Sequence, residues 1–212
     1  VNAIYFKGQW DLKFEEENTV EGKFWLNKDM SKSVKMIEQT NHLKFASLEA
    51  VQAKILEIPY EGNALSMVVL LPDEVDGLQK LEDKLTGEKL VEWTSHMNTR
   101  QVHLHLPRFK VEESYDLEAI LPKMGMVKAF SPGGADFSGM TNGRDLAVSK
   151  VRHKSFVEVN EEGTKAAAAT VVSIIRTSLT NSEDFHCDHP FLFFIKHNEK
   201  NNILFFGRFS SP

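Results

Sequence analysis

The stretch from residue 158 to residue 190 most constrains what this chain can fold into. It opens with an acidic pair and a glycine, passes through four consecutive alanines, and continues into β-branched residues between Val171 and Ile175. Alanine has the highest helix propensity, so the alanines alone favour a helix. The β-branched residues favour an extended chain, and no apolar stripe recurs at helical spacing. The stretch is therefore either a short helix or a segment with two states, an exposed loop and a strand whose small side chains can enter a sheet.

Most of the remaining chain has the alternation and the turn formers of short β-strands. The unbroken apolar run at 67–71 predicts a strand buried on both faces, and we expect the strands at 191–195 and 203–206 to be buried as well. Apolar anchors predict short helices over 78–85 and 87–96, and we also expect a helix over 115–124. The predicted strands are 1–8, 34–37, 42–45, 53–58, 65–71, 101–111, 148–159, 191–195 and 203–206.

His103 and His105 share one face of the predicted strand at 101–111, because residues two apart on a strand point the same way. A zinc site needs further ligands at tetrahedral spacing, and the sequence places no cysteine or carboxylate beside them. We therefore expect two exposed strand histidines, no metal site and no cofactor.

Composition and motifs argue against several functional classes. The net charge is −5 without a basic cluster, which disfavours nucleic-acid binding, and no apolar run is long enough for a membrane span. The sequence has no Gly-x-Ser-x-Gly, no His-Glu-x-x-His and no phosphate loop. Cys187 is the only cysteine, which excludes an internal disulfide, and the adjacent His186 points to the opposite face of an extended segment. We expect no enzyme.

Several motifs resemble the serpin family. The run Glu161, Glu162, Gly163, Thr164, Lys165, Ala166, Ala167, Ala168, Ala169, Thr170 is similar to the proximal hinge of an inhibitory serpin. Residues 2–10, 106–109, 188–195 and 207–212 are similar to family strands, with Asp188 in place of the usual asparagine. The resemblance extends over essentially the whole chain. It is greatest to the ovalbumin-type intracellular clade (clade B), near its squamous-cell-carcinoma-antigen and headpin group.

The resemblance implies a mixed α and β serpin fold, of which this chain is the C-terminal part. It implies strands of the main β-sheet, two smaller β-sheets, few short helices and an exposed reactive-centre loop at about 161–182. Residues 1–212 would form part of a single serpin domain. Because a serpin core is nearly twice this length, we expect the N-terminal helices to be absent.

The implied function is protease inhibition by a suicide-substrate mechanism, in which the loop is cleaved, the acyl-enzyme is trapped and the hinge inserts into the main sheet. The implied partners are trypsin-like or chymotrypsin-like serine proteases and cysteine cathepsins. The intact protein would be a cytoplasmic monomer, also released outside the cell without a signal peptide. A non-inhibitory binding or chaperone role and an inactive truncated product are the alternatives.

The resemblance also implies where the cut falls. Counting from the hinge places the scissile bond at Thr177-Ser178. The loop is about one residue shorter than in similar proteins, so Arg176-Thr177 is the alternative. Arg176 at the cut would suit a trypsin-like pocket, and Thr177 would suit a small neutral one.

Two further sets of residues match family positions that hold the main sheet. Trp10, Arg108 and Glu161 match the breach, where the loop first inserts, with an ion pair between Arg108 and Glu161. Asn2 and His153 match the shutter, where a hydrogen bond lies beneath the parting of the central strands. These roles are implied by the resemblance alone.

Overall fold

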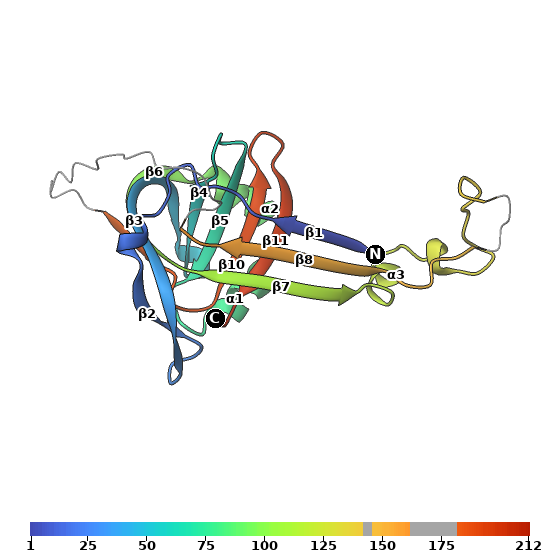
Figure 1. Cartoon of the computed structure of the whole chain (residues 1–212), viewed down its shortest axis with the longest axis horizontal. Helices are drawn as coiled ribbons and strands as arrows, with labels where there is room; N and C mark the ends of the chain where they lie inside the picture. The colour runs from blue at the N-terminus through green and yellow to red at the C-terminus, as the bar shows by residue number, and fades with distance from the viewer. Residues whose placement is uncertain (142–145, 162–181) are drawn as a thin grey trace. The chain divides into compact units, whose positions relative to one another are not determined.

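The computed structural model describes residues 1–141, 146–161 and 182–212, which gather into two compact units (Figure 1). We name them by their sheets. The three-stranded unit comprises residues 1–6 and 110–158, and the eight-stranded unit comprises residues 7–109 and 159–212.

Strands are the most abundant regular element of the described structure. They are β1 (Asn2–Phe6), β2 (Val20–Trp25), β3 (Ser31–Leu48), β4 (Ala53–Pro59), β5 (Leu65–Pro72), β6 (Asn98–Pro107), β7 (Phe109–Asp116), β8 (Arg152–Val159), β9 (Glu183–His186), β10 (Phe191–His197) and β11 (Asn202–Phe209). The α-helices are α1 (Leu78–Lys84), α2 (Gly87–Ser95) and α3 (Ile120–Lys123). Short 3-10 turns are η1 (Glu16–Asn18), η2 (Glu49–Val51) and η3 (Lys128–Phe130). Among the described residues, no helix is both long and apolar enough to cross a membrane.

The three-stranded unit is built on strands in the order β1-β8-β7, and β1 and β8 run parallel (Figure 1). Their register places Asn2 opposite His153 and Tyr5 opposite Phe156. The rings of Tyr5 and Phe156 stack with centroids 4.7 Å apart, and the Lys110 ammonium lies 4.8 Å from the Phe156 centroid. Tyr5 is nevertheless 61% exposed, so this sheet carries apolar side chains that face solvent.

The prediction of a helix over 115–124 is wrong for the first half of that range. Strand β7 continues to Asp116, and only residues Ile120–Lys123 are helical. The amide of Leu117 donates to the carbonyl of Val151 at 2.8 Å, so pairing beside β8 extends the strand beyond what local propensity favours. Gly125 follows at φ +105°, a conformation that favours glycine and ends the helix.

The eight-stranded unit contains one hydrogen-bonded sheet in the order β11-β10-β5-β4-β3-β6-β9, with β2 paired to β3. The 18-residue strand β3 explains this continuity. It pairs with β2 over its first residues, with β6 through its middle and with β4 at its end. The two smaller sheets expected from the resemblance are therefore joined through β3. The strand predicted over 101–111 is interrupted at Arg108, where β6 ends before β7 begins.

The core of this unit lies where α1 and α2 pack on β4, β5 and β10. Both helices were predicted from their apolar anchors and begin at the expected residues, Leu78 and Gly87. Residues 67–70 have no exposed surface, which confirms that β5 is buried on both faces. The buried members of the cluster are Leu48, Val51, Ala53, Ile55, Val68, Leu70, Leu78, Leu81, Leu90, Trp93, Met97, Leu192 and Phe194.

Aromatic rings fill a second part of the same unit. Phe109 stacks on Phe209 with centroids 4.6 Å apart and lies 5.3 Å from Phe193. Gly207 allows this packing, because a Cβ there would stand 2.7 Å from the ring of Phe193. The strand at 191–195 is buried as predicted.

The prediction that residues 203–206 are buried is wrong, since Ile203, Leu204 and Phe206 are all more than 40% exposed. Strand β11 lies at the end of the hydrogen-bonded order and has β10 as its one partner strand in the described structure. An edge strand with that position leaves apolar side chains in contact with solvent.

Candidate functional site around Glu161

Trp10 is the aromatic base of the site, and it is 2% exposed. It forms an isolated bridge with Tyr60, and the two rings stack with centroids 4.6 Å apart and planes 8° apart. The indole Nε1 donates to the carbonyl oxygen of Asn160 at 2.8 Å. Burial raises the pKa of Tyr60 well above its ordinary value, so this phenol stays neutral. Trp10 thereby fixes the backbone immediately before Glu161.

The carboxylate of Glu161 lies next to this fixed backbone. Glu161 is 5% exposed, and its Oε1 accepts a hydrogen bond from Thr19 Oγ1 at 2.7 Å. The same oxygen lies 3.4 Å from Nη1 of Arg108, whose side chain is 42% exposed. The carboxylate is therefore buried with a hydroxyl donor and a half-exposed cation. A buried charge requires partners of this kind.

Two backbone hydrogen bonds also involve Glu161 and Arg108. The carbonyl of Glu161 accepts from the amide of Phe14 at 3.1 Å, and the amide of Arg108 donates to the carbonyl of Lys35 at 2.8 Å. A cavity of about 240 Å³ opens beside the ion pair. Its lining is polar and carries both charges: Glu16, Thr19, Val20, Glu21, Lys35, Arg108 and Glu161.

The structure therefore brings together Trp10, Arg108 and Glu161 in the eight-stranded unit. Thr19, which makes the shortest side-chain hydrogen bond to Glu161, was missed by the sequence analysis. No pattern in the sequence identifies it, because it lies between η1 and β2, outside any regular element.

Asn2 and His153 form the second predicted contact, within the three-stranded unit. Nδ1 of His153 lies 3.2 Å from Oδ1 of Asn2, in agreement with the direct pairing of these residues across β1 and β8. The ring of Tyr115 stacks beside His153 with centroids 6.3 Å apart. Asn2 is exposed and His153 is half-buried.

The other predicted site residues lie outside the described residues. They are Glu162, Gly163, Thr164, Lys165, Ala166, Ala167, Ala168, Ala169 and Thr170 of the hinge, together with Arg176, Thr177 and Ser178 at the cut. Glu161 is the last described residue before them, and the chain is described again from residue 182.

Asp188, which the resemblance led us to expect as a departure from the family pattern, has partners of its own. Its Oδ1 lies 2.8 Å from Nδ1 of His189, whose Nε2 lies 2.7 Å from the carbonyl oxygen of Pro72. Burial alone raises the pKa of Asp188, but the hydrogen bond from His189 and the electrostatic effects of His186 and His189 lower it overall. A carboxylate is thus accommodated at this position by the imidazole that follows it.

Cys187 is fully buried, and its amide donates to the carbonyl of His105 at 2.9 Å. Burial, with a smaller effect of Asp188, raises the pKa of the thiol well above its ordinary value. A neutral buried thiol lacks the reactivity of a catalytic thiolate.

Comparisons with known proteins place this geometry in a family. The family model described as "Serpin (serine protease inhibitor)" matches residues 1–212. Human Serpin B4 is 64% identical and human Serpin B13 is 61% identical, each over the whole of this chain and 55% of the relative. The horse leukocyte elastase inhibitor is 52% identical over the whole chain and 58% of the relative. The chain thus spans little more than half the length of the curated relatives it matches.

Solved structures agree with the sequence comparisons. Uncleaved ovalbumin superposes with a TM-score of 0.87 at 41% identity, covering 99% of this chain and 53% of ovalbumin. The structure of a tumour-suppressing serpin superposes with a TM-score of 0.86 at 39% identity, covering 99% of this chain and 55% of that protein. The described fold is the C-terminal part of such a mixed α and β fold.

Proposed function

The chain belongs to the serpin family, and from that premise we propose that the full-length protein carrying it is a protease inhibitor that acts as a suicide substrate. A protease cleaves the loop at about 161–182 and is acylated. The hinge then enters the main sheet as a new strand and traps the acyl-enzyme. The observation that carries this proposal is the family match over residues 1–212, together with the small side chains that follow the buried Glu161.

The energetics of insertion are favourable on general grounds. Each new backbone hydrogen bond contributes about 0.5–1.5 kcal/mol net, so a strand with about a dozen of them gains on the order of 10 kcal/mol. Thr164 and the alanines at 166–169 add no bulky or charged group at positions that would face the interior. Alternation from Thr164 directs Lys165 to solvent, where its charge costs little.

Glu161 has a specific part in this proposal. Its carboxylate is held by Thr19 and Arg108, and the preceding carbonyl is held by Trp10. These contacts would form the breach, keeping the base of the loop in place until cleavage. Asn2 and His153 would form the shutter. Residues 1–212 would be part of one serpin domain.

The proposed targets follow from the residues at the cut. Arg176 at the scissile bond suits trypsin-like enzymes, and the apolar Ile175 before it suits papain-like cysteine proteases. Thr177 at the bond suits an enzyme with a small pocket, such as an elastase. One relative is named leukocyte elastase inhibitor, so elastases are included among the proteases to be tested. We place the protein in the cytoplasm, with release from the cell as a second location.

Complex formation tests the function and the bond together. The full-length protein is mixed in turn with trypsin, an elastase and a lysosomal cathepsin, and each mixture is denatured in SDS. We expect a complex that survives denaturation and a released peptide that starts at Ser178 or Thr177. Cleavage without any such complex would contradict inhibition and favour a non-inhibitory binding role, and a peptide starting beyond Leu179 would contradict both proposed bonds.

A further inference from the structure

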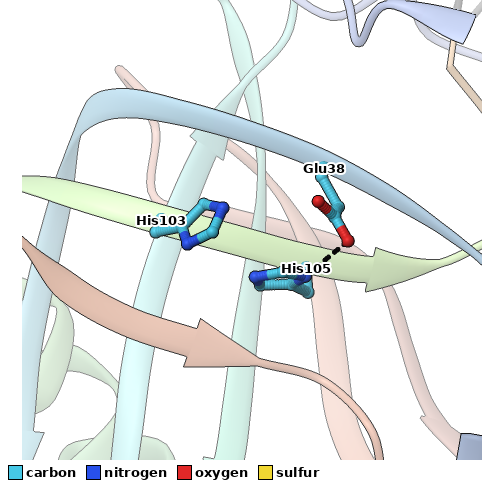
Figure 2. Close-up of side chains that lie close together, drawn as sticks. All are labelled: Glu38, His103 and His105. Carbon is cyan, nitrogen blue, oxygen red and sulfur yellow. Dashed lines mark ion pairs between the residues drawn. The ribbon is translucent and has the colours of Figure 1, made fainter. Parts of the chain in front are cut away.

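Two histidines on β6 lie beside a carboxylate that the sequence did not reveal. The rings of His103 and His105 have centroids 4.3 Å apart on the same face of β6. Glu38 extends from the neighbouring strand β3 toward them, as Figure 2 shows. The expectation that no carboxylate stands beside these histidines is therefore wrong. The register of β3 on β6 pairs Glu38 with His105, and the sequence alone does not specify that register.

The three side chains are spaced as ligands of one ion. One ligand atom from each of Glu38, His103 and His105 lies within 4.8 Å of the others. Nδ1 of His105 and Oε1 of Glu38 are 3.0 Å apart. Ligand bonds of about 2.0–2.1 Å at tetrahedral angles separate neighbouring ligand atoms by about 3.3 Å. Glu38 and His105 are thus close to that spacing, and the ligand atom of His103 lies within 4.8 Å of both.

The burial of the cluster suits an ion that keeps one solvent ligand. The side chains of His105 and Glu38 are 18% and 26% exposed, whereas that of His103 is 39% exposed. The outermost ligand, His103, therefore leaves a coordination position of the ion open to solvent.

Residues of β9 surround the cluster from the other side. Oδ1 of Asp184 lies 3.6 Å from Nδ1 of His103, and the ring of His186 lies 4.5 Å from that of His105. A ligating histidine commonly donates its second ring N–H to a carboxylate, which fixes its orientation. Asp184 would have to approach by a few tenths of an ångström to do this for Nδ1 of His103.

We propose that Glu38, His103 and His105 form a zinc-binding site that links β3 to β6, with water as the fourth ligand. Two histidines, one glutamate and water are a common ligand set for Zn²⁺ in proteins. This ligand set should bind Ca²⁺ and Mg²⁺ weakly, because these ions prefer oxygen ligands and two of the three side chains offer nitrogen. The proposal does not rest on protease inhibition, because it concerns binding to the uncut protein.

Direct titration tests the proposal. ZnCl₂ is added to the untagged, metal-free full-length protein in competition with a chromogenic chelator. We expect one site with a dissociation constant of about 10 μM or tighter, below the millimolar range of adventitious binding.

His103→Gln, His105→Gln and Glu38→Gln should each weaken zinc binding at least about tenfold, since even outer-shell losses cost about 10–100-fold. His96→Gln is the matched control, because His96 lies exposed at the end of α2, outside strands β3, β6 and β9. Its affinity should stay within about twofold of the wild type.

A second readout separates loss of the site from loss of the fold. Zn²⁺ should raise the Tm of the wild type and of His96→Gln, because a ligand that binds only the native state stabilises it. At the same zinc concentration it should raise the Tm of His103→Gln less, and the more exposed position of His103 favours a folded variant. A wild-type dissociation constant above about 1 mM, or unchanged zinc affinity when all three residues are replaced, would overturn the proposal.

Discussion

The Glu161 site and the Asn2–His153 contact were both expected from the family resemblance, but they differ in burial and in the number of partners. Glu161 is buried in the eight-stranded unit, with a hydroxyl, a guanidinium and two backbone hydrogen-bond partners nearby. Asn2 and His153 meet through one side-chain contact of 3.2 Å, and Asn2 is exposed. Removing a partner from a buried group costs far more than removing it from a solvated one. Removing a partner should therefore lower the free energy of unfolding more at Glu161 than at the Asn2–His153 contact.

Replacing Trp10 should produce the largest effect. Trp10→Ala removes a buried ring that stacks on Tyr60 and leaves a cavity, with an expected loss of about 3–5 kcal/mol. Trp10→Phe keeps a ring but removes the donor to Asn160, with an expected loss of about 1–2 kcal/mol. Chemical denaturation of the full-length protein measures both. A loss below about 1 kcal/mol for Trp10→Ala would mean that the site does not depend on this ring.

Reversing the charge of Glu161 should come next. Glu161→Lys places a cation beside Arg108 and removes the acceptor of Thr19, with an expected loss of about 3 kcal/mol. Solvent around the half-exposed Arg108 keeps the cost below that of a fully buried pair. The variant should also self-associate sooner on heating, since the base of the loop loses its anchor.

Glu17→Lys is the matched control, because Glu17 is exposed in η1 and undergoes the same charge change. Its stability should stay within about 0.5 kcal/mol of the wild type. Equal monomer yields of the two variants after heating would remove Glu161 from the proposed breach.

Acidification tests a second buried carboxylate of the eight-stranded unit. Glu57 is buried, which by itself raises its pKa, but hydrogen bonds from Lys196 and Lys44 lower the pKa overall below 4.5. The stabilisation from Glu57 is thus present above pH 4.5 and is lost as the pH falls through the folded-state pKa. Thermal melting between pH 3 and pH 5 should show a steeper decline in Tm for the wild type than for Glu57→Gln. Parallel declines would contradict this role.

The smallest effect is expected at the exposed contact. Asn2→Ala in a chain of residues 1–212 should cost at most about 0.5–1 kcal/mol, because solvent replaces the lost hydrogen bond. Measuring the same substitution in the full-length protein sharpens the comparison. A loss above about 2 kcal/mol there would show that further residues cover the contact, as the proposed shutter role requires.

The sequence predicted elements best where local pattern and burial agree. The apolar anchors of α1 and α2 and the continuous apolar run of β5 led to the correct elements, because each buries the face that its pattern defines. The prediction of helix at 115–117 was wrong, since pairing beside β8 outweighs local propensity there. The apolar residues of β11 were predicted to be buried, but an edge position leaves them exposed.

Side-chain partners across strands were harder to predict than the strands themselves. Arg108 and Glu161 were paired through the resemblance alone, and Thr19 was missed. Glu38 was missed because its position beside His105 depends on the register of two strands about 65 residues apart, which local patterns do not specify.

The central claim is that the segment after the buried Glu161 enters a sheet once it is cut. Thr164→Arg in the full-length protein, mixed with a protease that the wild type traps, tests it most directly, because a cation at an inward position opposes insertion. The matched control is Lys165→Arg, which keeps its charge on the face that alternation directs to solvent. We predict that Thr164→Arg is cleaved normally but forms less than about a tenth of the SDS-stable complex, whereas Lys165→Arg forms it fully. Undiminished complex with Thr164→Arg would contradict the claim.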